Sequence, residues 1–200
     1  IAIIFFWVYD LALNYLGSFH IIFDGLLFLI FFGILNGLLI RLVLLFGMLP
    51  PASYKMEDSR FQIWKIVGIL HEFAICALKP FEILFMRPIF AKLFGARIGK
   101  NVVMGGKLID PWFIEIQDCV ILGLNSAIIA HEMTSGFLKL KRVKLCARAT
   151  IGINAVIMPG VIVGENSIIA PGAIVKSDTE IPPNQIWGGV PAKFIKNILV

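Results

Sequence analysis

The second half of the chain places an aliphatic residue at every sixth position, a spacing that fits neither an α-helix nor a simply alternating strand. The series runs Ile98, Met104, Ile116, Leu122 and Ile128, then Leu145, Ile151, Ile157, Val163, Ile169, Val175 and Ile181, with Asp110 as its one exception. Small or β-branched residues stand four places after the later members, at Ala155, Val161, Ser167, Ala173 and Thr179. Hexads of this kind are typical of a parallel β-helix, in which three of them close one triangular coil. The pattern therefore predicts a mainly β fold of about four coils over residues 96–200.

The repeat is interrupted between Ile128 and Leu145, which are 17 residues apart rather than a multiple of six. Residues 129–144 are therefore predicted to leave the coil as a loop. The loop opens on His131 and Glu132 and carries basic side chains further along. A histidine has an ordinary pKa of about 6.5 and is a base at neutral pH, and a rigid coil would fix its position. We interpret His131 as a general base, with Glu132 or a carboxylate elsewhere orienting its ring.

The first half of the chain is much more apolar than the second. Residues 1–54 contain only three charged side chains, whereas residues 55–200 carry a net charge of +6. Residues 26–49 contain one charge and as a helix would extend roughly 36 Å, enough to cross a hydrocarbon core of about 30 Å. Residues 1–17 are a shorter apolar run, so 1–54 is predicted to be a transmembrane region of one or two spans. The roles of Asp10 and Asp24 stay open.

Residues 55–95 are predicted to form helices that lie at the membrane interface and link the two halves. One helix would begin after Ser59 and stop at Pro80, and a second would be bent by Pro88. Both are apolar around most of their circumference, with basic residues scattered among aromatic ones, which suits an interfacial position. The role of His71 within the first helix stays open. The chain begins without a methionine, which we interpret as a trimmed or processed N-terminus.

The three cysteines, Cys76, Cys119 and Cys146, form neither a CxxC pair nor a metal-binding spacing. Cys119 and Cys146 fall inside the six-residue pattern, and we interpret them as packing residues of a protein in a reducing compartment.

Several segments of the second half resemble the hexapeptide (left-handed β-helix) acyltransferases. They are "ARIGKNVVMGG", "IQDCVILGLNSAIIAHE", "ATIGINAVIMPGVIVGENSIIAPGAIVKSD" and "IWGGVPAKFIK", which together cover Ala96 to about Lys196. The resemblance implies that the coils wind left-handed and that three copies form a homotrimer with active sites between adjacent prisms. It implies that His131 removes a proton from an acceptor hydroxyl or amine, which then attacks the thioester of acetyl-CoA or another acyl-CoA.

The same resemblance implies residues that bind the co-substrate. Lys193 in "GVPAK" and Lys176 in "AIVKSD" match basic positions at the CoA groove, and the backbone around Gly152 and Ala170 matches segments that bind the pantetheine arm. No metal is expected. The apolar first half departs from the common soluble form of the family and favours a lipid-linked, sugar or membrane-delivered acceptor.

The sequence thus predicts an integral membrane acyltransferase whose catalytic domain faces the cytoplasm, where acyl-CoA is found and where basic segments are favoured. A non-catalytic β-helix that trimerises a membrane complex is the alternative. A zinc-dependent carbonic anhydrase on the same prism would need three histidine ligands, and the prism holds only His131. No interleaving of basic and aromatic residues indicates nucleic-acid binding. The acceptor, O- versus N-acylation and the acyl chain length stay open.

Overall fold

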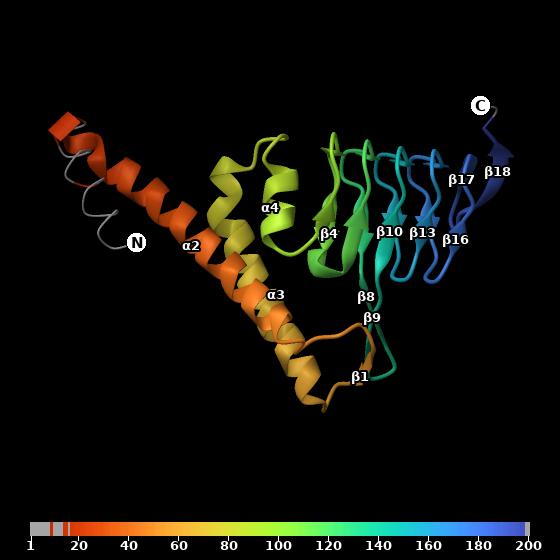
Figure 1. The fold of residues 1–200 in the computed structure, drawn as a ribbon, viewed down its shortest axis with the longest axis horizontal. Helices are drawn as coiled ribbons and strands as arrows, with labels where there is room; N and C mark the ends of the chain where they lie inside the picture. Colours follow the sequence, from red (N-terminus) through yellow and green to blue (C-terminus); the bar gives the residue numbers. More distant parts are fainter. Residues whose placement is uncertain (1–8, 10–13, 16, 199–200) are drawn as a thin grey trace.

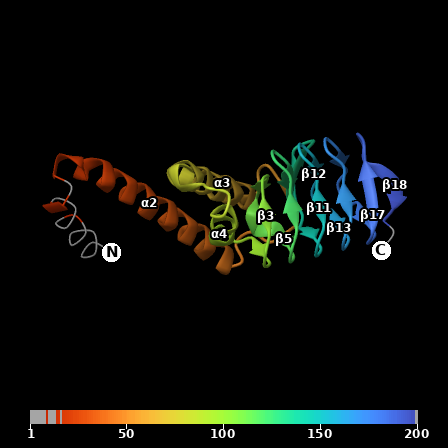
Figure 2. The ribbon, with the colours of Figure 1, turned by 90° about the horizontal axis from the view of Figure 1, so that it is seen from above.

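The computed structural model describes residue 9, residues 14–15 and residues 17–198, so Asp10 lies outside the described residues. Helices gather at one end of the molecule and a β-helix extends from them (Figure 1). Seen from above, the helices again lie end to end with the prism and do not wrap around it (Figure 2). The site described below lies where the two parts meet.

Within residues 17–95, the helical part contains three α-helices and two short 3-10 helices. They are η1 (Gly17–Phe19), α2 (His20–Leu45), α3 (Ser59–Leu78), η2 (Lys79–Phe81) and α4 (Arg87–Leu93). Two glycines let α2 lie close to its neighbours: an added Cβ would be 2.5 Å from Leu78 Cγ at Gly33 and 2.6 Å from Leu93 Cγ at Gly37. Arg41, the one charge in the apolar run, donates to the Leu93 carbonyl at 3.1 Å and to that of Lys92. It thereby binds the carboxyl end of α4, where a helix favours positive charge.

Two helices in the described part of the chain are long and apolar enough to cross a membrane, namely α2 and the stretch Ser59–Phe81. The second of these was expected to lie at the interface. Buried helices of soluble proteins can have the same length and composition. The fraction of each helix that is buried therefore says more about whether it could contact a membrane. Only 22% of the most apolar window of α2 and 33% of that of Ser59–Phe81 is buried. Both helices therefore expose apolar side chains: α2 exposes many along its length, and α3 exposes Ile66, Ile69 and Phe73 beside polar residues.

The β-helix consists of four complete coils and part of a fifth. The strands, in chain order, are β2 (Arg97–Ile98), β3 (Val103–Met104), β4 (Lys107–Ile109), β5 (Ile114–Ile116), β6 (Ile121–Leu122), β7 (Ala127–Ile129), β10 (Val143–Leu145), β11 (Thr150–Ile151), β12 (Val156–Ile157), β13 (Ile162–Val163), β14 (Ile168–Ile169), β15 (Ile174–Val175), β16 (Glu180–Ile181), β17 (Gln185–Gly188) and β18 (Lys193–Asn197). They form three parallel sheets: a first sheet of β2, β5, β10, β13 and β16, a second sheet of β3, β6, β11, β14 and β17, and a third sheet of β4, β7, β12 and β15. The final strand, β18, adds to the second sheet antiparallel to β17.

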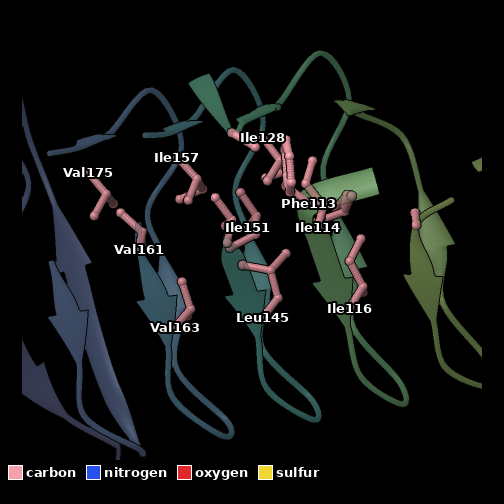
Figure 3. Packing of buried hydrophobic residues seen from close by; sticks show 14 of the residues in the cluster. Phe113, Ile114, Ile116, Ile128, Leu145, Ile151, Ile157, Val161, Val163 and Val175 are labelled. Atoms are coloured by element: carbon pink, nitrogen blue, oxygen red, sulfur yellow. The ribbon is translucent and has the colours of Figure 1, made fainter. Parts of the chain in front are cut away.

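The six-residue series forms the core, as the sequence predicts. Ile116, Leu145 and Val163 stack along the first sheet, and Ile128 and Ile157 stack along the third (Figure 3). Each of these side chains is at most 1% exposed. Burying one aliphatic side chain completely contributes about 1.5–3 kcal/mol, so the stacked series is a large part of the stability of the prism.

The coils turn at residues whose backbone is left-handed, three places after the aliphatic positions. Asn125, Asn154 and Asn166 all have φ of +57°. Asparagine tolerates this conformation because its short side chain bonds to the local backbone. Cys119 occupies the equivalent turn with φ of +59° and is exposed, so its interpretation as a packing residue is wrong.

The segment predicted as a loop is an ordered β-hairpin. Strand β8 (His131–Thr134) pairs antiparallel with β9 (Phe137–Leu140), and β9 pairs in turn with β1 (Ser53–Lys55) from the segment between α2 and α3. Figure 1 shows the three strands leaving the prism together. Leu138 and Leu140 are buried at 0% and 1% exposure, because alternate residues of β9 face the core. The hairpin therefore joins the helical part to the prism.

Candidate active site

Asp110 stands at the corner of the prism between the third and first sheets. Leu108, and not Asp110, takes the inward place in the first coil, where it pairs with Ile128 of the next coil. The spacing from Leu108 to Ile116 is consequently eight residues, and the extra residues form η3 (Pro111–Phe113). Asp110 immediately precedes η3 with a left-handed backbone, φ +58°, and its residue exposure is only 5%.

His131 lies at the same corner, one coil further on. It begins β8 directly after β7 and Ala130, opposite Leu140 on β9. Its ring Nδ1 donates to Asp110 Oδ2. The other carboxylate oxygen, Oδ1, accepts a 3.0 Å hydrogen bond from Trp64 Nε1 on α3. The ring of Trp64 also meets the imidazole edge-on, with the centroids 5.0 Å apart.

This arrangement can support proton transfer. A carboxylate that accepts from Nδ1–H holds the neutral imidazole in the tautomer whose Nε2 carries the lone pair. The same carboxylate stabilises the imidazolium that forms when Nε2 takes a proton. The side chain of His131 is 25% exposed, so a reactant can approach the ring, whereas the Asp110 side chain is 5% exposed.

Glu132 points away from the His131 ring, because successive residues of a strand face opposite sides. Its carboxylate accepts a 3.0 Å hydrogen bond from Ser177 Oγ, and its strand partner is Lys139. The carboxylate on the ring is that of Asp110, which sequence reasoning did not identify as a site residue. The signal was present in the sequence: Asp110 is the one polar interruption of the six-residue series.

The proposed CoA-binding residues fall into two groups on opposite edges of the third sheet. Gly152 and Ala170 lie against each other on successive coils, where a Cβ on Gly152 would be 2.7 Å from the Ala170 carbonyl carbon. Lys193 is close to them, since its strand partner Gly188 lies against Ala170. Lys176 lies instead at the corner that carries His131, next to the Ser177 that binds Glu132. Both lysines are exposed.

A shallow hollow of about 440 Å³ lies beside the hairpin on this corner. Its walls include Ser53 from β1 and the basic residues Lys139, Lys141 and Arg142. Lys141 forms an ion pair with Asp178, which also lines the hollow. The excess of positive charge suits an anionic group.

Burial perturbs two titratable side chains, Tyr54 beside the hairpin and Cys146 at another corner of the prism. Burial raises the pKa of Tyr54, whose hydroxyl donates to the Pro50 carbonyl at 2.6 Å and whose strand partner is Leu138 of the hairpin. Burial likewise raises the pKa of the Cys146 thiol on the prism. His71 of α3 is buried against the rings of Phe94 and Trp112, with centroids 4.8 and 5.7 Å away.

No group of three or more histidine, cysteine, aspartate or glutamate side chains converges as a metal site within residues 17–198 and the few described before them. All three cysteines are free.

Comparison with known proteins identifies the repeat and the fold. Residues 142–177 match the family described as bacterial transferase hexapeptide (six repeats). No curated protein matches the chain in sequence. A maltose O-acetyltransferase from Clostridium difficile 630 is similar in structure, with 20% identity, a TM-score of 0.58 and coverage of 76% of this chain and 96% of that chain. A galactoside acetyltransferase in complex with coenzyme A has 19% identity, a TM-score of 0.54 and coverage of 74% and 86%.

A hexapeptide-repeat acetyltransferase from Vibrio cholerae has 24% identity and a TM-score of 0.49, and the match covers 54% of this chain. The match spans 65% of that protein, less than two thirds of its length. At these identities, the similarity with the higher TM-scores establishes the fold. The chain is a left-handed β-helix of hexapeptide repeats preceded by apolar helices, as the sequence predicts, and its resemblance to the hexapeptide-repeat acyltransferases is confirmed at the level of the repeat and the fold.

Proposed function

We propose that this protein transfers an acyl group from acyl-CoA, with acetyl-CoA as the expected donor, to a hydroxyl or amine. The observation that carries the proposal is the Asp110–His131 pair at the corner of a hexapeptide-repeat prism. His131 would act as the general base and Asp110 as the group that orients it. The similar structures are acetyltransferases, one of them bound to coenzyme A, which supports this donor and this class of reaction.

In the proposed reaction, His131 Nε2 takes the proton of the acceptor hydroxyl or amine as its oxygen or nitrogen attacks the thioester carbonyl. The new bond to the acyl carbon forms and the carbon–sulfur bond breaks. The imidazolium then returns its proton to the departing CoA sulfur. Asp110 stabilises the transient positive charge on the ring. Neither metal nor redox cofactor takes part, and Glu132 is proposed to hold the hairpin through Ser177.

The proposed donor site needs more than one copy of the chain. Gly152, Ala170 and Lys193 lie on the edge of the third sheet opposite to His131 and Lys176. A homotrimer in which one prism offers the first group and its neighbour offers His131 would bring the two together. CoA would lie along that groove, with its phosphates near the lysines.

The character of the sheets supports this assembly. Outward-facing residues of the second sheet include Val103, Ile121 and Ile168, and the third sheet presents residues such as Val156 and Ile174. The first sheet instead presents a charged row in which Arg97 and Lys144 both approach Glu115, at 3.9 and 3.6 Å. Two apolar faces that share a corner suit the contacts around a threefold axis, where each copy meets two neighbours.

We further propose that the chain is an integral membrane protein with the prism in the cytoplasm, and that its acceptor is lipid-linked, a sugar, or otherwise delivered at the bilayer. The exposed apolar surfaces of α2 and α3 support this proposal. Of the region 1–54, the part up to the end of α2 would lie in the membrane and β1 beside the prism, where it pairs with β9; residues 55–95 would lie at the interface and residues 96–200 outside. The basic hollow beside the hairpin would suit an anionic group on the acceptor or donor.

The test is thioester cleavage by the full chain in nanodiscs, with acetyl-CoA and a membrane lipid extract. His131→Ala should lower kcat by about 10²- to 10⁴-fold and leave CoA binding intact, as expected when a general base is removed. Met133→Ala, at an exposed position of the same strand, should match wild type. If His131→Ala matched wild type, or wild type bound no acetyl-CoA, the catalytic proposal would fail and a trimerising scaffold would be the better account.

A further inference from the structure

The indole of Trp64 reaches the candidate active site from the helical part of the molecule. Trp64 lies in the second turn of α3, whose first turn is fixed by Asp58, since the Asp58 side chain accepts from the Arg60 backbone N–H at 2.9 Å. Phe61 stacks on the same indole, with the centroids 5.8 Å apart. The ring is therefore carried by α3 and reaches the prism, where it packs against the core.

Trp64 and His131 share the carboxylate of Asp110 between them. Oδ1 accepts from the indole N–H at 3.0 Å and Oδ2 accepts from the imidazole. The terminal torsion of an aspartate is soft, so a carboxylate with one partner can rotate within a broad range. A second, directional donor on the other oxygen restricts that rotation. The plane of the carboxylate, and with it the direction in which the imidazole is held, then depends on Trp64.

We propose that Trp64 is a positioning residue that acts on His131 through Asp110, so that α3 contributes to the reaction centre as well as to the apolar helical part. This inference rests on the proposed function. It adds that the hydrogen bond from Trp64 to Asp110 links the position of α3 to the Asp110–His131 pair. Removing that bond should slow the chemical step while leaving the binding of the donor unchanged.

Trp64→Phe keeps an aromatic ring on α3 and removes only the N–H donor and part of the indole. We expect kcat to fall by about 10-fold with the KM for acetyl-CoA unchanged, at the lower end of the roughly 10- to 100-fold cost of losing a partner that orients a metal-ligating side chain. Rates are to be normalised to CoA-binding sites titrated in the same nanodisc sample. A partly unfolded preparation then cannot imitate a slower reaction.

Trp112→Phe is the matched control. Trp112 also packs between the helices and the prism, but its indole nitrogen is buried with no hydrogen-bond partner among the described residues. The same chemical change there removes no hydrogen bond and should leave kcat at the wild-type value.

A double-mutant cycle separates positioning from a general loss of packing. If Trp64 acts through Asp110, then Trp64→Phe should have less than about a 2-fold effect in an Asp110→Asn background, because the oriented carboxylate is already gone. An equal loss in both backgrounds, or a kcat for Trp64→Phe equal to that of Trp112→Phe, would overturn the inference. If either of these outcomes is found while His131→Ala is inactive in the same assay, only the role of Trp64 is rejected. If His131→Ala stays active, the proposed function itself fails.

Discussion

At the scale of single residues, the two acidic side chains near His131 should have very different effects on catalysis. Asp110→Asn places an amide where the imidazole Nδ1–H needs an acceptor, and so favours the wrong tautomer. We expect kcat/KM to fall by about 100-fold or more. Glu132→Gln should lower kcat/KM by less than about 3-fold, because its amide oxygen can still accept the part-buried hydrogen bond from Ser177. Steady-state rates with acetyl-CoA, beside thermal melts of both variants, test this.

A larger loss in Glu132→Gln than in Asp110→Asn would instead favour the role that the sequence alone assigned to Glu132.

His131 could be found from the sequence because the break in the repeat marks where a side chain leaves the coil. The sequence marks Asp110 as the one polar interruption of the series, but it does not pair Asp110 with His131, because periodicity places Asp110 in an inward position and does not show that Leu108 takes that place. The inward residues of the first coil are unequally spaced, four residues from Met104 to Leu108 and eight from Leu108 to Ile116. This spacing brings Asp110 to the corner.

At the scale of secondary-structure elements, the close approach of α2 to α3 and α4 depends on two glycines. Gly37→Leu would force a side chain into Leu93, and we expect a loss of about 1–3 kcal/mol in unfolding free energy, as is usual for overpacking. Gly25→Leu is the matched control, because nothing lies within 4 Å of a Cβ at that position of the same helix. Thermal unfolding and limited proteolysis in detergent would measure the difference.

Equal destabilisation by Gly25→Leu and Gly37→Leu would contradict this packing.

The sequence predicted α2 from its unbroken apolar run, but the side on which the helix packs depends on tertiary partners that no periodicity specifies. The hairpin illustrates the same limit. Alternating residues from Phe137 to Leu140 are a strand pattern, yet their pairing with Ser53–Lys55 joins segments more than 80 residues apart in the chain. The repeat itself was predictable because each coil contacts only its neighbours.

A prediction about the hairpin follows from that pairing. Leu138→Ala removes a fully buried side chain opposite Tyr54, and we expect about 2–5 kcal/mol of local destabilisation. Because His131 lies on the adjacent strand, the faster opening should be seen as loss of amide protection over residues 131–140 in hydrogen exchange. Protection in the coils from β10 onward should persist. Uniform loss of protection over the whole prism would show that the hairpin is not a separate unit.

At the scale of the whole molecule, the apolar second and third sheets, the charged first sheet and the separation of most of the proposed CoA-binding residues from His131 all favour the proposed trimer. The proposed trimer would bury apolar faces and leave the row of Arg97, Glu115 and Lys144 in water. It would also place each His131 beside the Gly152 and Ala170 edge of a neighbour. The helices extend beyond one end of the prism (Figure 1), so the same assembly would gather three sets of apolar helices on one side.

A pair of charge substitutions tests this assembly. Ile121 on the second sheet and Ile162 on the first are both outward-facing strand residues, 46% and 37% exposed, so glutamate at either position is tolerated by the fold of one chain. Ile121→Glu would bury an unpaired charge between copies, which is costly, and should yield monomers by light scattering in detergent. Ile162→Glu should stay trimeric. Because the proposed donor site is built from two copies, Ile121→Glu should also lose acetyl transfer while keeping its melting transition. Monomers from Ile162→Glu and trimers from Ile121→Glu would move the contact to the charged sheet and separate His131 from the proposed CoA groove.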